Sequence, residues 1–217
     1  ALLRFDLSAI PAGAVVTQAM LQVYATGWSG SNISLGAYAV LRDVALNQTT
    51  WNVARSGQPW GTPGCNNTNT DRRATAESTL TTSGVNKWYT FDLTSLVEEW
   101  VSSSLANNGV LLRQTVSAAY KFDFASAEYS TARLRPKLVI TYRSAASPTS
   151  TPVSPTATPM LTPTSAPSVT PTQTPAPGGT ESTITLQQGS SGYGGNSDTY
   201  IYQYVANTNY SAQTTSS

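Results

Sequence analysis

Tyr120-Lys121-Phe122-Asp123-Phe124 is the stretch that decides the fold, because aromatic and charged residues alternate along it with a period of two. Similar short runs of apolar and aromatic residues occur around residues 3–7, 15–24, 33–37, 88–91, 110–112 and 138–142. Alternation of this kind, punctuated by turn residues, is typical of antiparallel strands with one buried face. Many short strands predict an all-β fold, an antiparallel β-sandwich or jelly roll.

One stretch departs from this pattern. Its apolar residues recur at helical spacing, at Leu93, Leu96, Val97, Trp100 and Val101. Ser95 and Glu98 have the spacing of a capping box, and Asn108-Gly109 follows as a stop signal. The sequence therefore predicts one short helix at an end of the sandwich.

The chain divides into three segments by composition. We expect a sandwich domain over residues 1–143, an extended linker over 144–180 and a pair of strands over 181–217. Nine of the 13 prolines lie in the linker, among Thr, Ser, Ala and Val. Because proline fixes φ and lacks the amide donor, this segment favours polyproline II conformation and reaches on the order of 100 Å.

The composition also limits the classes of function. Charged residues make up only 11% of the chain and the net charge is +1, so the basic surface of a nucleic-acid-binding protein is missing. No apolar run approaches the roughly 18 residues of a membrane span. Since Ser, Thr and Asn replace the usual Lys and Glu, we expect an extracellular or cell-surface protein that neither binds nucleic acid nor inserts into membranes.

Little in the sequence supports catalysis. The chain has no histidine, which removes the common nucleophile systems and the commonest metal ligand. Glu98 and Glu99 are adjacent and do not form the facing pair of glycosidases. We therefore expect no enzyme and no cofactor. Asn67, Asn69 and Asp71 are candidate calcium ligands, but turn formation explains the same residues.

The chain has five tryptophans, and exposed tryptophan rings are the usual platforms for sugar stacking. Trp88 and Trp100 lie in core patterns, and Trp51 and Trp60 are expected to hold a long loop in place. Trp28, in a Gly-Trp-Ser-Gly turn, is the one candidate platform among them, although the turn favours a partly buried loop anchor.

Several positions are candidates for glycosylation. The sequence contains N-glycosylation sequons at Asn32, Asn47, Asn66 and Asn209. Ser/Thr-rich tracts with proline are typical of O-glycosylated stalks, which makes candidates of Thr158, Thr162, Thr170 and Thr174.

Four stretches together resemble the DNRLRE domain family, which comprises secreted β-sandwich modules that overlap with carbohydrate-binding modules. They are LLRFDLSAIPAG (2–13), TWNVARSGQPWGTPG (50–64), WYTFDLTSLVEEWV (88–101) and FASAEY with RPKLVITY (124–142). The resemblance implies that such a domain opens with a strand pair carrying Asp-Thr-Tyr and Asn-x-Asn-Tyr elements. In this chain these elements lie at the other end, at residues 198–200 and 207–210.

A sandwich without its opening strands exposes unpaired amides and core side chains, so another segment must fill the gap. The expected assembly residues are Ile184, Leu186, Tyr200, Ile201, Tyr202 and Val205, and the expected acceptor edge is Leu3 and Phe5. Three sources of the strands are open: the next molecule, the same chain as a circular permutation, or the next repeat of a tandem array.

The leading hypothesis is a structural subunit of an extracellular filament or surface fibre. Residues 181–217 would be donated head-to-tail into the next copy, so the expected partner is the chain itself. The alternative is a carbohydrate-binding module of a multidomain surface protein, with polysaccharide as its partner.

Overall fold

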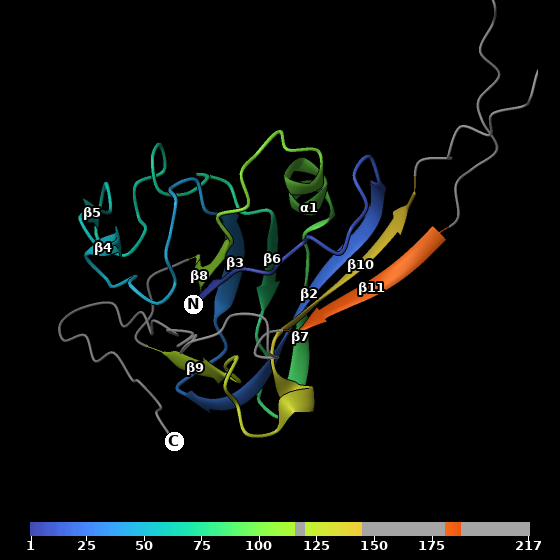
Figure 1. Cartoon of the computed structure of the whole chain (residues 1–217). Helices are drawn as coiled ribbons and strands as arrows, with labels where there is room; N and C mark the ends of the chain where they lie inside the picture. The colour runs from blue at the N-terminus through green and yellow to red at the C-terminus, as the bar shows by residue number, and fades with distance from the viewer. Residues whose placement is uncertain (116–119, 145–180, 188–217) are drawn as a thin grey trace, which may run out of the picture.

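The computed structural model describes residues 1–115, 120–144 and 181–187. All strand pairings in these residues are antiparallel, as the alternating pattern predicted. Two sheets enclose a common core, which confirms the all-β sandwich (Figure 1).

The first sheet has four strands in the order β1-β8-β3-β6. Their bounds are β1 Leu2–Leu3, β3 Ser34–Ala39, β6 Ser78–Thr81 and β8 Val110–Gln114. Outside this sheet lies the long segment 41–76, which contains a two-stranded hairpin of β4 (Val53–Arg55) and β5 (Gln58–Pro59).

The second sheet has the order β11-β10-β2-β7, with β9 paired to the far end of β2. Its strands are β2 Val15–Ser29, β7 Lys87–Asp92, β9 Lys121–Phe124, β10 Lys137–Arg143 and β11 Glu181–Gln187. Strand β2 is long enough to pair with β10 near its start and with β9 near its end. A bulge opposite Thr141/Tyr142 shifts the register, so Val16 and Ala19 both point inward although three positions separate them.

Between the sheets lies the main hydrophobic cluster. Its largest fully buried side chains come from several elements and include Leu21, Val23, Phe91, Leu96, Leu138 and Ile140. A second cluster, containing Tyr38, Val44, Trp60 and Leu111, lies between the four-stranded sheet and segment 41–76. The four-stranded sheet is thus covered by apolar contacts on both faces.

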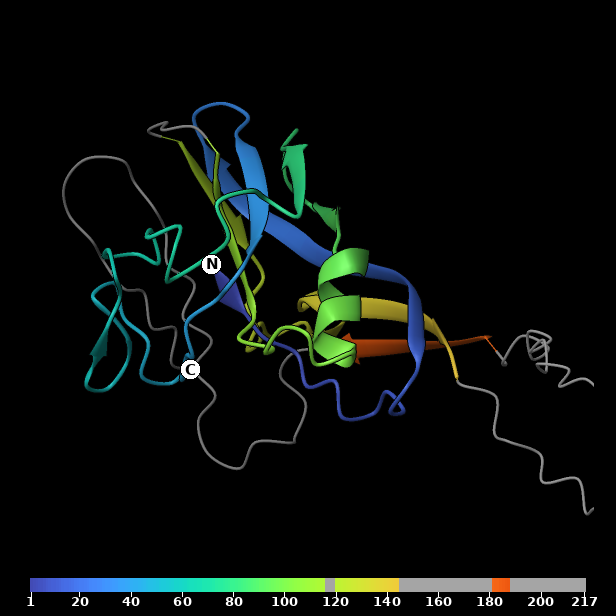
Figure 2. The same cartoon turned by 90° about the horizontal axis from the view of Figure 1, so that it is seen from above.

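The predicted helix is α1, Thr94–Val101 (Figure 2). It packs Leu96, Val97 and Trp100 into the core. The predicted capping box is wrong. Helix α1 begins at Thr94, so Ser95 lies inside its first turn. Leu93 occupies the N-cap position and makes no side-chain capping hydrogen bond. Instead, Asp92 Oδ1 accepts hydrogen bonds from the backbone N–H and the hydroxyl of Thr94. A short 3-10 helix, Ala132–Leu134, precedes β10.

Candidate functional site: an edge that accepts a strand

Strand β11 pairs along the whole length of β10 and extends the five-stranded sheet (Figure 1). The register runs without a break from Lys137 opposite Gln187 to Arg143 opposite Glu181. The predicted strand at 182–187 is therefore confirmed, and its acceptor is β10.

The side chains of β11 alternate between core and solvent. Ser182, Ile184 and Leu186 are half-buried, and the last two pack against the main cluster. Ile184 lies opposite Ile140, and Leu186 lies opposite Leu138, both of which are fully buried. Thr183 and Thr185 face solvent. A shift by one residue would reverse this pattern, so burial fixes the register.

Polar contacts reinforce the pairing. Thr141 and Thr183 hydroxyls lie 3.1 Å apart, and Gln187 Nε2 donates to the carbonyl of Ala132 at 2.6 Å. Thr17 Oγ1 donates to a carboxylate oxygen of Glu181 at 3.4 Å. These contacts lie at the start, middle and end of β11, so they hold the whole strand on the edge.

Two expectations about this edge are wrong. Donation into the next copy would leave Ile184 and Leu186 exposed in an isolated chain, but they pack on the core of their own molecule, as a circular permutation requires. Leu3 and Phe5 were expected to mark the acceptor edge, but they are core residues, 3% and 4% exposed, and β1 pairs with β8 in the other sheet. Tyr200, Ile201, Tyr202 and Val205 lie outside the described residues, as does the linker from residue 145 to 180.

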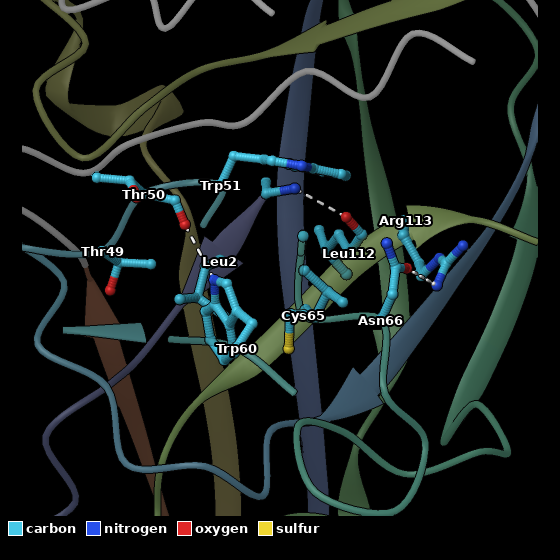
Figure 3. Close-up of a pocket in the computed structure, with 12 residues that line it drawn as sticks. Leu2, Thr49, Thr50, Trp51, Trp60, Cys65, Asn66, Leu112 and Arg113 are labelled. Atoms are coloured by element: carbon cyan, nitrogen blue, oxygen red, sulfur yellow. Dashed lines mark hydrogen bonds between the residues drawn. The ribbon is translucent and has the colours of Figure 1, made fainter. Parts of the chain in front are cut away.

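A pocket of about 480 Å³, including its open mouth, lies on the outer side of the four-stranded sheet (Figure 3). Trp51, Trp60, Leu2 and Leu111 form much of its apolar lining, and Arg113 lies on its wall. Trp60 Nε1 donates to the Thr50 carbonyl, and the Trp51 ring lies so close to Gly64 that a Cβ there would be 2.1 Å from it. Both tryptophans therefore hold the loop, as predicted, and also line the pocket.

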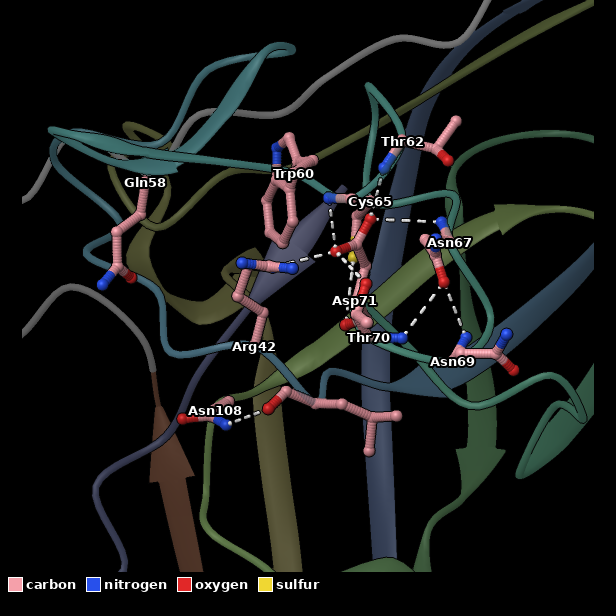
Figure 4. A network of polar contacts seen from close by, with 12 residues as sticks. Arg42, Gln58, Trp60, Thr62, Cys65, Asn67, Asn69, Thr70, Asp71 and Asn108 are labelled. Atoms are coloured by element: carbon pink, nitrogen blue, oxygen red, sulfur yellow. Dashed lines mark hydrogen bonds and ion pairs between the residues drawn. The ribbon is translucent and has the colours of Figure 1, made fainter.

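The candidate calcium ligands form a different structure (Figure 4). The Asp71 side chain is fully buried, and its carboxylate accepts hydrogen bonds from the backbone N–H groups of Gly61, Thr62 and Asn67. Arg42 Nε lies 2.9 Å from the same carboxylate. Asn67 Oδ1 accepts from the N–H groups of Asn69 and Thr70.

These oxygens already have protein donors, and the Arg42 cation occupies the side of Asp71 that a metal would need. Burial raises the pKa of Asp71, but the hydrogen bonds outweigh it and hold that pKa below its ordinary value. The three residues thus serve as an internal frame for loop 61–72. Among the described residues, no group of three His, Cys, Asp or Glu side chains is placed to hold a metal ion.

Cys65 lies in the same loop and is buried. Burial, together with the nearby Asp71, raises the pKa of its thiol to about 12. The thiol is therefore protonated and unreactive at neutral pH.

The remaining tryptophans lie in contrasting environments. Trp28 is 45% exposed beside Phe122, with ring centroids 5.8 Å apart, so it remains a candidate platform. Trp100 is buried, as predicted. The prediction that Trp88 is a core residue is wrong. It is half-buried on the outer face of the five-stranded sheet, edge-on to Tyr24, with Lys137 Nζ 4.4 Å from its ring centroid.

The sequons differ in accessibility. Asn32 and Asn47 are exposed, although the hydroxyl of Thr49 in the second sequon is buried and donates to the Ala54 carbonyl. Asn66 is half-buried, and its amide contacts the Pro63 carbonyl and Arg113. Asn209 and the candidates Thr158, Thr162, Thr170 and Thr174 lie outside the described residues.

Comparison with known proteins identifies the family of this chain. No curated protein and no solved structure matches the chain. In the described residues, no helix has the length and apolar character needed to cross a membrane. The family model that matches is that of the disaggregatase related repeat domain, over residues 1–140. This corrects the resemblance to DNRLRE domains, which rested on four short stretches of sequence. The chain belongs to the disaggregatase related repeat family.

Proposed function

We propose that this chain is a non-catalytic structural subunit of an extracellular filament or surface fibre, in which strand β11 of one copy completes the sandwich of the next. The observation behind the proposal is the unbroken seven-residue pairing of β11 with β10, which shows that this edge accepts a strand that follows a proline-rich segment. The pairing lies within one chain, so donation to the next copy requires that this strand be exchanged between copies. Strand addition at a sheet edge is a general mode of recognition, in which backbone hydrogen bonds give affinity and alternate side chains give specificity.

The contacts of β11 are sufficient for such a role. Ile184 and Leu186 cover the edge of the core beside Ile140 and Leu138. Burial of a complete aliphatic side chain contributes about 1.5–3 kcal/mol, so two half-buried residues contribute a few kcal/mol together. Removal of the strand would also expose the unpaired amides of β10, an edge that favours aggregation.

The family name and the composition support the same proposal. The matching model is described as a repeat domain, and copies arranged in tandem would place a strand-bearing segment beside each sandwich. The low charge and the Pro/Thr-rich linker are typical of extracellular stalks.

The test is to delete residues 181–217 and to measure the mass and thermal stability of the product. We expect a poorly stable monomer that does not assemble, and a synthetic 181–187 peptide should restore stability. A control peptide with Ile184→Ser and Leu186→Ser should not. Filaments that persist after the deletion, or equal rescue by both peptides, would contradict the proposal.

A second candidate is a carbohydrate-binding module, and the exposed ring of Trp28 favours it. The pocket beside Trp51 and Trp60 is a second apolar surface on which a sugar ring could lie. Retention of the full chain on insoluble polysaccharides, and its loss in Trp28→Ala or Trp51→Ala, would support this candidate. Absence of retention on a broad panel would argue against it.

A further inference from the structure

The end of β10 and the start of β11 lie next to each other, although a long segment of chain joins them. Arg143, the last residue of β10, is directly opposite Glu181, the first residue of β11. Opposite residues in an antiparallel pair have Cα atoms about 4.5–5.5 Å apart. A loop of about two residues is enough to join such a pair, yet 37 residues lie between them.

The contacts that hold β11 do not require that it belong to the same molecule. Its described partners are β10, Thr17 of β2 and Ala132 before β10, and all of them belong to the sandwich. A β11 strand from a second copy would make the same hydrogen bonds and bury the same side chains. The free-energy difference between the two arrangements therefore comes from the linker and from association, not from the interface.

We infer that the fold described here is a self-blocked resting state, in which each chain occupies its own acceptor edge and assembly requires exchange of β11 between copies. This inference rests on the proposed function, because it concerns the regulation of the same strand. In the described part of such a chain, β11 is already paired and the edge of β10 is already covered. The chain therefore remains monomeric until neighbouring copies compete with its own linker.

The linker sets the concentration at which that competition begins. A flexible tether of this length gives its own strand an effective concentration on the order of millimolar. A flexible chain of 37 residues has a root-mean-square span of roughly 35 Å, whereas polyproline II conformation extends it toward about 115 Å. The two ends of the linker must come within one strand spacing of each other when β11 pairs with β10 of its own chain. A proline-rich composition favours extended conformations, so it lowers the effective concentration of β11 at its own β10 and favours exchange.

Cysteine pairs can separate the two arrangements. Thr141 and Thr183 are opposite each other with hydroxyls 3.1 Å apart, so Thr141→Cys and Thr183→Cys together should form a disulfide within one chain. The wild-type chain, whose only cysteine is the buried Cys65, is the control and should not cross-link. This double variant tests strand addition itself.

Exchange is tested by mixing a Thr141→Cys chain with a Thr183→Cys chain that carries a tag of a different size. After equilibration and brief oxidation, we expect a negligible heterodimer fraction at micromolar concentration and a rise of at least tenfold toward millimolar concentration. If the double variant forms no disulfide, the pairing of β11 with β10 is wrong and both proposals fail. If the mixed chains never cross-link, β11 pairs only with its own chain, and donation between copies is overturned together with exchange. If the mixed chains cross-link fully even at micromolar concentration, donation between copies stands and the self-blocked state alone is overturned.

A hairpin variant is the matched control for the linker. Replacement of residues 144–180 by Asn-Gly should lock β11 on its own edge, because this dipeptide favours two-residue hairpin turns. We expect no heterodimer from this variant at any concentration and a higher thermal midpoint. Heterodimers as abundant as in the full-length mixture would overturn the inference.

Discussion

Two parts of the fold are completed in opposite ways. The hydrogen-bond and ion-pair network around Asp71 is called the polar closure, and the pairing of β11 with β10 is called the apolar closure. Asp71 is held by groups that lie close in sequence, from Gly61 to Thr70, together with Arg42. Strand β11 is held by β10 across an intervening segment of 37 residues. The first closure is polar and, apart from Arg42, local in sequence, whereas the second is mostly apolar and involves a strand that follows a long segment. Under the proposed assembly, the first closure is a permanent part of the domain, and the second leaves a strand that copies exchange.

The largest effect is expected at the polar closure. Asp71→Ala would leave Arg42 without its carboxylate and several backbone N–H groups without an acceptor in a buried site. Removal of one partner from a buried ion pair costs about 3–5 kcal/mol. Urea unfolding should show a loss of this size, while Thr68→Ala, an exposed position in the same loop, should change stability by less than about 0.5 kcal/mol. Equal stability of the two variants would show that the Asp71 network is not what holds the loop.

The apolar closure should respond to single side chains by a smaller amount. Leu186→Ala removes a half-buried residue that packs on the core, and we expect a loss of about 1–2 kcal/mol, below the range for fully buried leucines. Thr185→Ala, on the opposite face of the same strand, is the matched control and should cost less than about 0.5 kcal/mol. Thermal unfolding of dilute monomers measures both. If Thr185→Ala is as harmful as Leu186→Ala, the register of β11 described here is wrong.

These two closures also show what could be predicted from the sequence. The period of two located β9, β10 and β11, and the helical spacing located α1, because each periodicity follows from backbone geometry. Periodicity does not say which sheet edge a strand joins, so β10 was missed as the acceptor. It also does not say which face of a strand is inward, and Trp88 was therefore placed in the core.

The candidate site was harder to predict for a related reason. Asn67, Asn69 and Asp71 have a spacing that suits a cation, but the donors that occupy their oxygens include Arg42, 29 positions before Asp71. No local pattern in the sequence indicates that contact. Identification of the family failed because it rested on short strand motifs such as residues 2–13, whereas the family model that matches covers residues 1–140 as a whole.

The polar closure should also depend on pH. The pKa of Asp71 is lower in the folded chain than in the unfolded chain, so its contribution to stability is present above the unfolded pKa of about 4. That contribution is lost as the pH falls through the folded pKa. Each unit of difference between the two pKa values corresponds to about 1.4 kcal/mol. Urea midpoints between pH 7 and pH 3 should fall more steeply for the wild-type chain than for Asp71→Asn, and parallel curves would contradict the assignment.

The smallest effect on stability is expected at Trp28, which belongs to neither closure. Its ring is 45% exposed and has Phe122 as its aromatic neighbour, so Trp28→Ala should change the free energy of unfolding by no more than about 1 kcal/mol. Tyr120→Ala, another exposed aromatic residue, is the control for the general loss of aromatic surface. If the chain binds polysaccharide through a stacking platform, Trp28→Ala should abolish retention on that polysaccharide while stability and the exchange of β11 remain unchanged. Loss of strand exchange in Trp28→Ala would contradict the independence of the Trp28 surface and the β10 edge. It would show that the two are coupled through β2, which pairs with both β9 and β10.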